Sequence, residues 1–171
     1  MTISVRDLRR SRGDRQWLER AYREYLNDLA PLGTGVFPTL PEFGHREDDQ
    51  LTNWFADPSA HLLTVLKDSE PVGFAMVRTG QLIAGRSPVD FSMAEFFVAR
   101  PWRRRHIGRE AVRLILDRFS GRWHIMEYLR NPQAVAFWRR VVSEYTAGRF
   151  QERAENGEIH QYFESGARLA H

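Results

Sequence analysis

The chain has 171 residues, of which 42% are hydrophobic and 12% aromatic, enough for one domain with a sizeable core. It contains no cysteine, which excludes disulfides, thiolate metal sites and a cysteine nucleophile and suits a reducing cytoplasm. No run approaches the roughly 20 apolar residues of a membrane span, and the first residues lack the apolar core of a signal peptide. We therefore expect one domain over residues 1–171, cytoplasmic and without a membrane partner.

The formal net charge is +3, and the positive side is almost entirely arginine, with Lys67 as the single lysine. Guanidinium groups pair well with phosphates and carboxylates, although a GC-rich coding bias produces the same enrichment. A basic patch is also typical of nucleic-acid binding. Here the arginines are dispersed and lack a helix-turn-helix, zinc-finger or RNA-binding aromatic pattern, so we expect no nucleic-acid partner. The six histidines are scattered without ligand spacing, so we expect no metal site.

The first half of the chain predicts two helices and three strands. In order, these are a strand at residues 2–7, a helix capped by Asp14 and ended by Pro31, a short helix near residues 48–55, and a hairpin of strands at 61–66 and 72–78. The first helix has one apolar face, consisting of Trp17, Leu18, Ala21, Tyr22, Tyr25, Leu26 and Leu29. That face predicts packing against a sheet.

The second half alternates strands and helices. It predicts a strand at residues 92–98, a helix with the apolar stripe Ile107, Ala111, Leu114, Ile115 and Phe119, a strand at 123–128, a helix from Pro132, and strands at 149–153 and 158–164. Asn156-Gly157 between the last two strands is typical of a type I′ hairpin turn. Taken together, the order of elements predicts a mixed α/β or α+β protein with helices on both faces of a sheet.

A basic turn lies between the strand that ends at Val98 and the helix that follows. It contains Arg103-Arg104-Arg105-His106-Ile107-Gly108. Backbone N–H groups in such a turn, together with the N-terminus of the next helix, can point at one anion. The turn therefore predicts a site for a pyrophosphate.

The chain resembles the GCN5-related N-acetyltransferase (GNAT) superfamily in two motifs. Arg103 to Gly108 matches the Q/R-x-x-G-x-G/A turn of that superfamily, with His106 where the first glycine is usual. Asn131, Ala134 and Trp138 match an N-x-x-A-x-x-x-Y signature, with tryptophan in place of tyrosine. The resemblance implies a mostly antiparallel seven-stranded sheet whose fourth and fifth strands splay apart.

The same resemblance implies that acetyl-CoA binds as a co-substrate in this splayed opening. The residues that it assigns to the cofactor are Phe97, Val98, Ala99, Arg103, Arg104, Arg105, His106, Ile107, Gly108, Arg109, Asn131, Phe137 and Trp138. The main chain near Phe97 to Ala99 would pair with the pantetheine arm, and the turn would hold the pyrophosphate. His106 either donates to a phosphate or caps the turn, and Asn131 either bonds the pantetheine or a water or caps the next helix.

Two glutamates are candidate general bases for the implied attack of an amine on the thioester. Glu95 lies on the fourth strand, where alternation places it with Met93 and Phe97 on one apolar face, and Glu127 lies on the fifth strand. A carboxylate among apolar groups has a raised pKa, as a base requires. A hydrogen-bonded or edge-exposed Glu95 is the alternative interpretation.

The departing thiolate lacks the usual phenol, because an indole N–H at Trp138 is not a useful acid. Solvent could protonate it, Tyr128 or Tyr145 could substitute, or the protein could bind acyl-CoA without turnover. The last possibility makes it a non-catalytic acyl-CoA-binding regulator of the same fold.

The acyl acceptor is expected to be a small amine. The first two helices and residues 32–44 and 80–90 contain the aromatic residues and acids that would recognise it, namely Phe37, Phe43, His45, Trp54, Phe55, Glu42, Glu47, Asp48 and Asp49. Helix N-terminal acids and ordinary core aromatics explain the same pattern. Residues 158–164 could also pair across a two-fold axis, which would make the protein a homodimer.

Overall fold

The computed structural model describes residues 1–32, 46–80 and 88–166, which are built on one seven-stranded sheet. Its strand order is β1-β2-β3-β4-β5-β7-β6, and every neighbouring pair is antiparallel except β4 and β5, which are parallel. The strands are β1 (Ile3–Asp7), β2 (His61–Lys67), β3 (Glu70–Thr79), β4 (Phe91–Val98), β5 (Arg122–Tyr128), β6 (Phe150–Glu155) and β7 (Glu158–Glu164). The predicted order of elements and the predicted sheet are confirmed.

In the described part of the chain, four α-helices and three short 3-10 helices join these strands. They are η1 (Leu8–Arg10), α1 (Arg12–Leu29), η2 (Ala30–Leu32), α2 (Arg46–Ala56), η4 (Arg100–Trp102), α3 (Ile107–Arg118) and α4 (Pro132–Thr146). Among the described residues, no helix has both the length and the apolarity that crossing a membrane requires.

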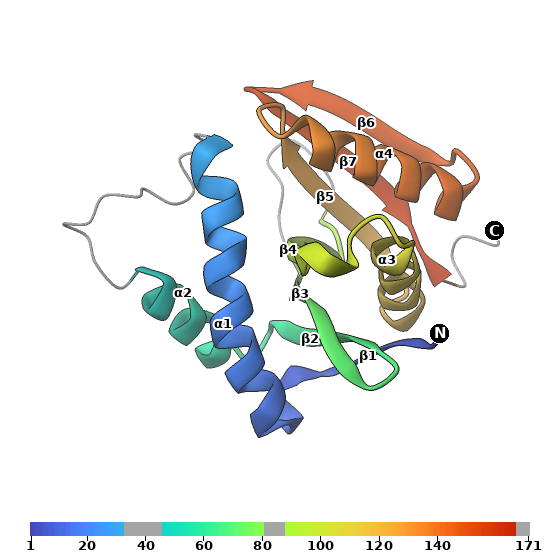
Figure 1. Ribbon diagram of the computed structural model, residues 1–171. Helices are drawn as coiled ribbons and strands as arrows, with labels where there is room; N and C mark the ends of the chain where they lie inside the picture. Colours follow the sequence, from blue (N-terminus) through green and yellow to red (C-terminus); the bar gives the residue numbers. More distant parts are fainter. Residues whose placement is uncertain (33–45, 81–87, 167–171) are drawn as a thin grey trace.

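The helices cover the sheet on two faces, with α1 and α2 on one side and α3 and α4 on the other (Figure 1). The core under α1 and α2 includes Leu18, Tyr22, Trp54, Phe74 and Phe97. The core under α3 and α4 includes Val112, Ile115, Trp123, Ile125 and Trp138. The alternation of β5 continues this division, because Trp123, Ile125 and Glu127 are buried while their neighbours are only partly buried.

The start of α1 differs from the prediction. Ser11, not Asp14, is the N-cap, because its hydroxyl accepts the Asp14 N–H at 3.2 Å. The Asp14 carboxylate points inward and accepts two hydrogen bonds from Arg6, each 2.7 Å, and one from Thr64 at 2.9 Å. Asp14 therefore ties α1 to β1 and β2 instead of capping the helix.

A β-bulge in β4 changes which side chains share a face. Met76 of β3 pairs with Glu95 and Val77 pairs with Met93, so Ala94 is an extra residue in β4. As a result Met93 joins the core under α3 and α4, whereas Phe97 joins the core under α1 and α2. The prediction that Met93 and Glu95 lie on one face is wrong, because the bulge reverses the alternation between them.

The sheet opens between β4 and β5. The two strands pair only at Phe91 with Trp123, Ser92 with His124 and Met93 with Ile125. Beyond these pairs each strand continues for several residues without a ladder to the other. The splayed strands implied by the sequence resemblance are therefore present.

The last two strands form the predicted hairpin. Asn156 and Gly157 have φ values of 52° and 77°, as a type I′ turn requires, and β7 lies between β5 and β6.

Candidate functional site

The turn between β4 and α3 has the backbone shape of an anion site. Arg104 and His106 have φ values of 59° and 61°, which turn successive N–H groups toward one point. His106 is the N-cap of α3 in a left-handed conformation, and its side chain makes no capping hydrogen bond. The first N–H groups of α3, starting at Ile107, have no partner within the helix and add the positive end of its dipole. The turn thus presents several amides to a single anionic group.

Gly108 allows α3 to approach α4 and the end of β4. A Cβ atom at this position would lie 3.3 Å from two ring carbons of Phe137 and 3.6 Å from a methyl group of Val98. A larger side chain would push α3 away from both neighbours. Gly108 therefore maintains the spacing at the mouth of the opening.

Arg103 is held within the protein. Its Nε donates to the Val98 carbonyl at 2.8 Å, and its guanidinium forms an ion pair with Asp28 at 2.5 Å. Arg100 pairs with the same carboxylate at 3.0 Å. These contacts join the C-terminal end of α1 to the turn between β4 and α3, so Arg103 fixes the position of this turn through contacts within the protein.

At the end of β4, only some of the main-chain groups are free to form hydrogen bonds with a ligand. Ala99 donates its N–H to Val72, and its carbonyl accepts from Trp102, both at 2.8 Å. Both main-chain groups of Ala99 are thus paired within the protein, so the implied pairing of Ala99 with pantetheine lacks a free group. Strand alternation then points the N–H of Val98 away from β3, toward the opening beside β5.

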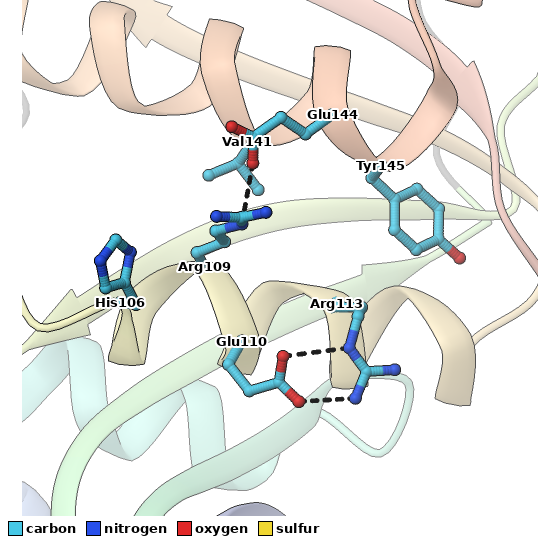
Figure 2. A pocket seen from close by; sticks show the side chains of 7 residues that line it. All are labelled: His106, Arg109, Glu110, Arg113, Val141, Glu144 and Tyr145. Atoms are coloured by element: carbon cyan, nitrogen blue, oxygen red, sulfur yellow. Dashed lines mark hydrogen bonds and ion pairs between the residues drawn. The ribbon is translucent and has the colours of Figure 1, made fainter.

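A cavity of about 300 Å³ lies between α3 and α4 next to the turn (Figure 2). It is lined by His106, Arg109, Glu110, Arg113, Val141, Glu144 and Tyr145. The charged groups in it are already paired: Arg109 contacts Glu144 at 2.8 Å, and Arg113 contacts Glu110 at 2.6 Å. Because each guanidinium faces a carboxylate, the cavity has no net preference for an anion.

Asn131 and the aromatic residues of α4 border the opening on the other side. The Asn131 side chain accepts the Ala134 N–H at 3.2 Å, so it caps α4 as one of its two interpretations proposed. Trp138 is buried in the core under α4 and packs edge-on against Phe96 and Phe137. Phe137 stacks on Phe96, with ring centroids 5.8 Å apart. Trp138 and Phe137 thus form an apolar wall and supply no acid.

Glu95 lies in an aromatic compartment on the opposite face of the sheet from α3 and α4. This Glu95 compartment is defined by Tyr22 and Tyr25 of α1, Gln50 and Trp54 of α2, and Glu95 and Phe97 of β4. The Tyr22 hydroxyl donates to Glu95 Oε1 at 2.9 Å, while Glu95 Oε2 is buried and has no hydrogen-bond partner within residues 1–32, 46–80 and 88–166. Burial raises the pKa of Glu95 to about 7, although the bond from Tyr22 and the charge of Arg78 oppose this.

Glu127 is on the other face, beneath α4. It is 4% exposed, and neither carboxylate oxygen has a hydrogen-bond partner among the residues that the structure describes. Burial, with a smaller contribution from Glu152, raises the pKa of Glu127 to about 8, against the opposing charge of Arg139. The structure therefore does not bring the two predicted bases together, and Glu127 is outside the compartment that contains Glu95.

The two phenols considered as acids also occupy different regions. Burial, then the charge of Glu158, raises the pKa of Tyr128, and burial, then the charges of Glu95 and Tyr128, raises the pKa of Tyr25. Tyr128 is thus on the same side as the Glu95 compartment. The Tyr145 hydroxyl instead donates to Asp117 at 2.7 Å and accepts the Gly166 N–H, so Tyr145 joins α3, α4 and the end of β7.

Sequence reasoning missed Tyr22, Gln50 and Asp28. Tyr22 was assigned only to an apolar helix face, although a hydroxyl on a buried face is itself a sign of a polar partner. The acceptor residues predicted at 37, 42, 43 and 45, and the side chains of residues 47–49, lie outside the described residues.

The comparison with family models matches residues 15–142 to the description "Acetyltransferase (GNAT) family". The chain belongs to this GNAT family. A search of curated proteins found no match.

Solved structures of acetyltransferases have the same fold at low sequence identity. An acetyltransferase from Thermus thermophilus is 20% identical with a TM-score of 0.61, and 96% of this chain and 97% of that chain are covered. A spermidine N-acetyltransferase from Vibrio cholerae, in complex with CoA and spermine, is 13% identical with a TM-score of 0.63 over 99% and 98% of the two chains. The PaiA N-acetyltransferase from Thermoplasma acidophilum, in complex with coenzyme A, is 13% identical with a TM-score of 0.59 over 96% and 99%.

Proposed function

We propose that this GNAT protein transfers an acetyl group from acetyl-CoA to the primary amine of a small molecule, by direct attack while both substrates are bound. The observation that carries the proposal is Glu95, which has one buried oxygen without a hydrogen-bond partner in the described part of the chain and a pKa raised to about 7. It lies on the strand that leads into the anion turn, beside the opening of the sheet. A general base at neutral pH needs this combination of pKa and position.

The residues around the opening fit acetyl-CoA. The amides from Arg104 to Arg109 suit a pyrophosphate, Gly108 keeps the mouth of the opening narrow, and the N–H of Val98 faces the space between the strands. Asn131, Phe137 and Trp138 form its other wall. When bound there, acetyl-CoA supplies the acyl group as a thioester.

The protein residues then have distinct tasks. An ammonium group of ordinary pKa near 10 must lose a proton before it can attack, and Glu95 Oε2 accepts that proton. The N–H of Val98 stabilises the negative charge that develops on the thioester oxygen. Holding both substrates in one opening makes the attack effectively unimolecular.

The aromatic lining of the Glu95 compartment favours a cationic acceptor. The rings of Tyr25 and Phe97 lie 5.9 Å apart, and Trp54 already stacks under the Arg78 guanidinium at 4.4 Å. Such rings attract cations through their faces. One structural relative is a spermidine enzyme, which makes polyamines a natural part of the acceptor panel.

The test is a thiol-release assay with acetyl-CoA and a panel of polyamines, amino sugars and amino acids. We expect turnover with at least one amine, and its loss in Glu95→Gln while calorimetry still detects CoA binding. Turnover that survives Glu95→Gln unchanged would contradict the assigned role of Glu95.

A second candidate function is a non-catalytic acyl-CoA-binding protein of the same fold. The observation in its favour is Trp138, which occupies the position of the usual phenol and is buried against Phe96 and Phe137. CoA binding without turnover of any amine in the panel would favour this function over the first.

A further inference from the structure

The Tyr22 hydroxyl contacts two acceptors in the Glu95 compartment. It lies 2.9 Å from Glu95 Oε1 and 2.9 Å from Gln50 Oε1, and both contacts have the geometry of a bond that Tyr22 donates. A phenol carries one proton, so a full-strength bond is possible to only one of the two oxygens at a time. Which oxygen receives it depends on the charge of Glu95, because a carboxylate is a stronger acceptor than a neutral acid or an amide.

We infer that Tyr22 and Gln50 are positioning residues that act as a two-position switch for Glu95. The Tyr22 hydroxyl donates to Glu95 when the carboxyl group is ionised, and it turns to Gln50 when the carboxyl group is protonated. Tyr22 thereby stabilises the anion, whereas Gln50 competes for the same proton and stabilises the neutral acid. Tyr22 and Gln50 lie on two helices and Glu95 on a strand, so the three groups hold Glu95 Oε1 in place, while Oε2 is buried without a hydrogen-bond partner among the described residues.

Other groups that face Glu95 from the packed elements do not replace this pair. Trp54 of α2 lowers the pKa of Glu95 less than Tyr22 does, and Arg78 of β3 contributes only through its charge, with its guanidinium over the Trp54 ring at 4.4 Å. Tyr25 of α1 is deeply buried, and Glu95 disfavours its ionisation, so Tyr25 stays neutral. Of the described residues, Tyr22 is therefore the one whose bond responds most directly to a change of charge on Glu95.

The switch lets Glu95 accept a proton from the substrate at a small cost in free energy. This use of the switch rests on the proposed function. Before the attack, an N–H bond of the substrate ammonium breaks and an O–H bond forms at Glu95 Oε2, and the lone pair left on nitrogen then attacks the thioester carbon. The carboxyl group becomes neutral, so the Tyr22 proton moves from Glu95 to Gln50 by rotation about its C–O bond. No other proton has to enter or leave the buried compartment.

The experiment measures the ionisation of Glu95 directly, in the absence of both substrates. Glutamate is labelled with ¹³C at the carboxyl carbon, the Glu95 signal is identified from its loss in Glu95→Gln, and its shift is followed with pH. Tyr22→Phe removes the donor, so the pKa of Glu95 should rise by about half to one unit. Gln50→Met removes the competing acceptor at similar volume, so the pKa of Glu95 should fall by about half a unit.

Tyr145→Phe is the matched control. It removes a phenol that also donates to a carboxylate, Asp117, yet lies elsewhere in the fold, so the pKa of Glu95 should not move. Shifts of opposite sign in Tyr22→Phe and Gln50→Met support the switch, whereas shifts of the same sign or no shifts overturn it. If Tyr22→Phe does not fold, Gln50→Met decides alone: a lower pKa supports the switch, and an unchanged or higher one overturns it.

The two proposals fail separately. If no amine is acetylated but the opposite shifts are seen, the proposed function fails and the switch stands. If amines are acetylated and the shifts are absent, only the switch fails.

Discussion

Glu95 and Glu127 lie on neighbouring strands, yet the sheet places them in different environments. Burial raises the pKa of both, to about 7 for Glu95 and about 8 for Glu127. Glu95 receives a bond from Tyr22 in an aromatic compartment under α1 and α2, whereas Glu127 lies beneath α4 and has no hydrogen-bond partner in the described residues. A raised pKa thus reports burial, and a role as base also requires a partner and a free oxygen on the substrate side.

Asp14 is a third buried carboxylate, and both of its oxygens accept hydrogen bonds. It is 1% exposed, and its hydrogen bonds from Arg6 and Thr64 outweigh the effect of burial, so its pKa is lowered. The three carboxyl groups therefore form a series in which hydrogen bonding falls from Asp14 through Glu95 to Glu127.

The largest expected effect is the loss of activity in Glu95→Gln. An amide cannot accept the substrate proton, so kcat/KM should fall by about 10²–10⁴-fold in the thiol-release assay. Glu127→Gln is the matched control and should change kcat/KM by less than about threefold, because Glu127 lies on the opposite face. Equal losses in both variants would break the distinction between the two regions.

Asp14→Asn should cause the largest loss of stability. The amide weakens the two bonds from Arg6, whose side chain is about half exposed, and the bond from Thr64 at the buried end, so the free energy of unfolding should fall by about 1–3 kcal/mol in urea at pH 7. Because the folded pKa of Asp14 is lowered, its contribution is present above the unfolded pKa and disappears as the pH falls through the folded one. Glu19→Gln, at an exposed pair with Arg15, should cost less than about 0.5 kcal/mol.

Gly108→Leu should weaken CoA binding by about tenfold or more, measured by calorimetry. The added side chain would contact Phe137 and Val98 at the mouth of the opening between β4 and β5, where we propose that CoA binds. Gly13→Leu places the same side chain on the exposed start of α1, where only Ser11 is near, and should leave CoA binding unchanged. Unaltered CoA affinity in Gly108→Leu would show that the nucleotide binds elsewhere.

The smallest expected effect is a pH-dependent gain of stability in Glu127→Gln. As the pH rises from 4.5 toward 8, the unfolded chain releases the Glu127 proton while the folded protein retains it, so the wild type loses stability over this range. The variant should be more stable than the wild type by roughly 1–2 kcal/mol at pH 8 and equal to it near pH 4.5. In Glu95→Gln the corresponding gain in the free energy of unfolding should level off near pH 7 instead of near pH 8. Urea titrations at several pH values will distinguish the two variants.

Much of the fold was readable from local patterns. The apolar stripes of α1, α3 and α4, the Asn156-Gly157 turn and the N-cap at Asn131 depend on neighbours a few residues away, so they could be predicted from the sequence. The basic turn after Val98 and the family motifs around it were local as well. These features indicated the GNAT family, which the family model over residues 15–142 shows, and they predict an anion site at the turn.

What the tertiary structure decided depends on contacts far apart in the chain. The bulge at Ala94 separates Met93 from Glu95, and no local alternation reveals it, because it comes from the pairing of β4 with β3. The division of Glu95 and Glu127 between two faces also depends on such contacts. So do the contacts of Tyr22, which lies 73 residues before Glu95 and 28 residues before Gln50 in the sequence. The sequence therefore determined the helices, the strands and the basic turn after Val98. Packing decided which carboxyl group has the hydrogen-bond partner that we propose for a base.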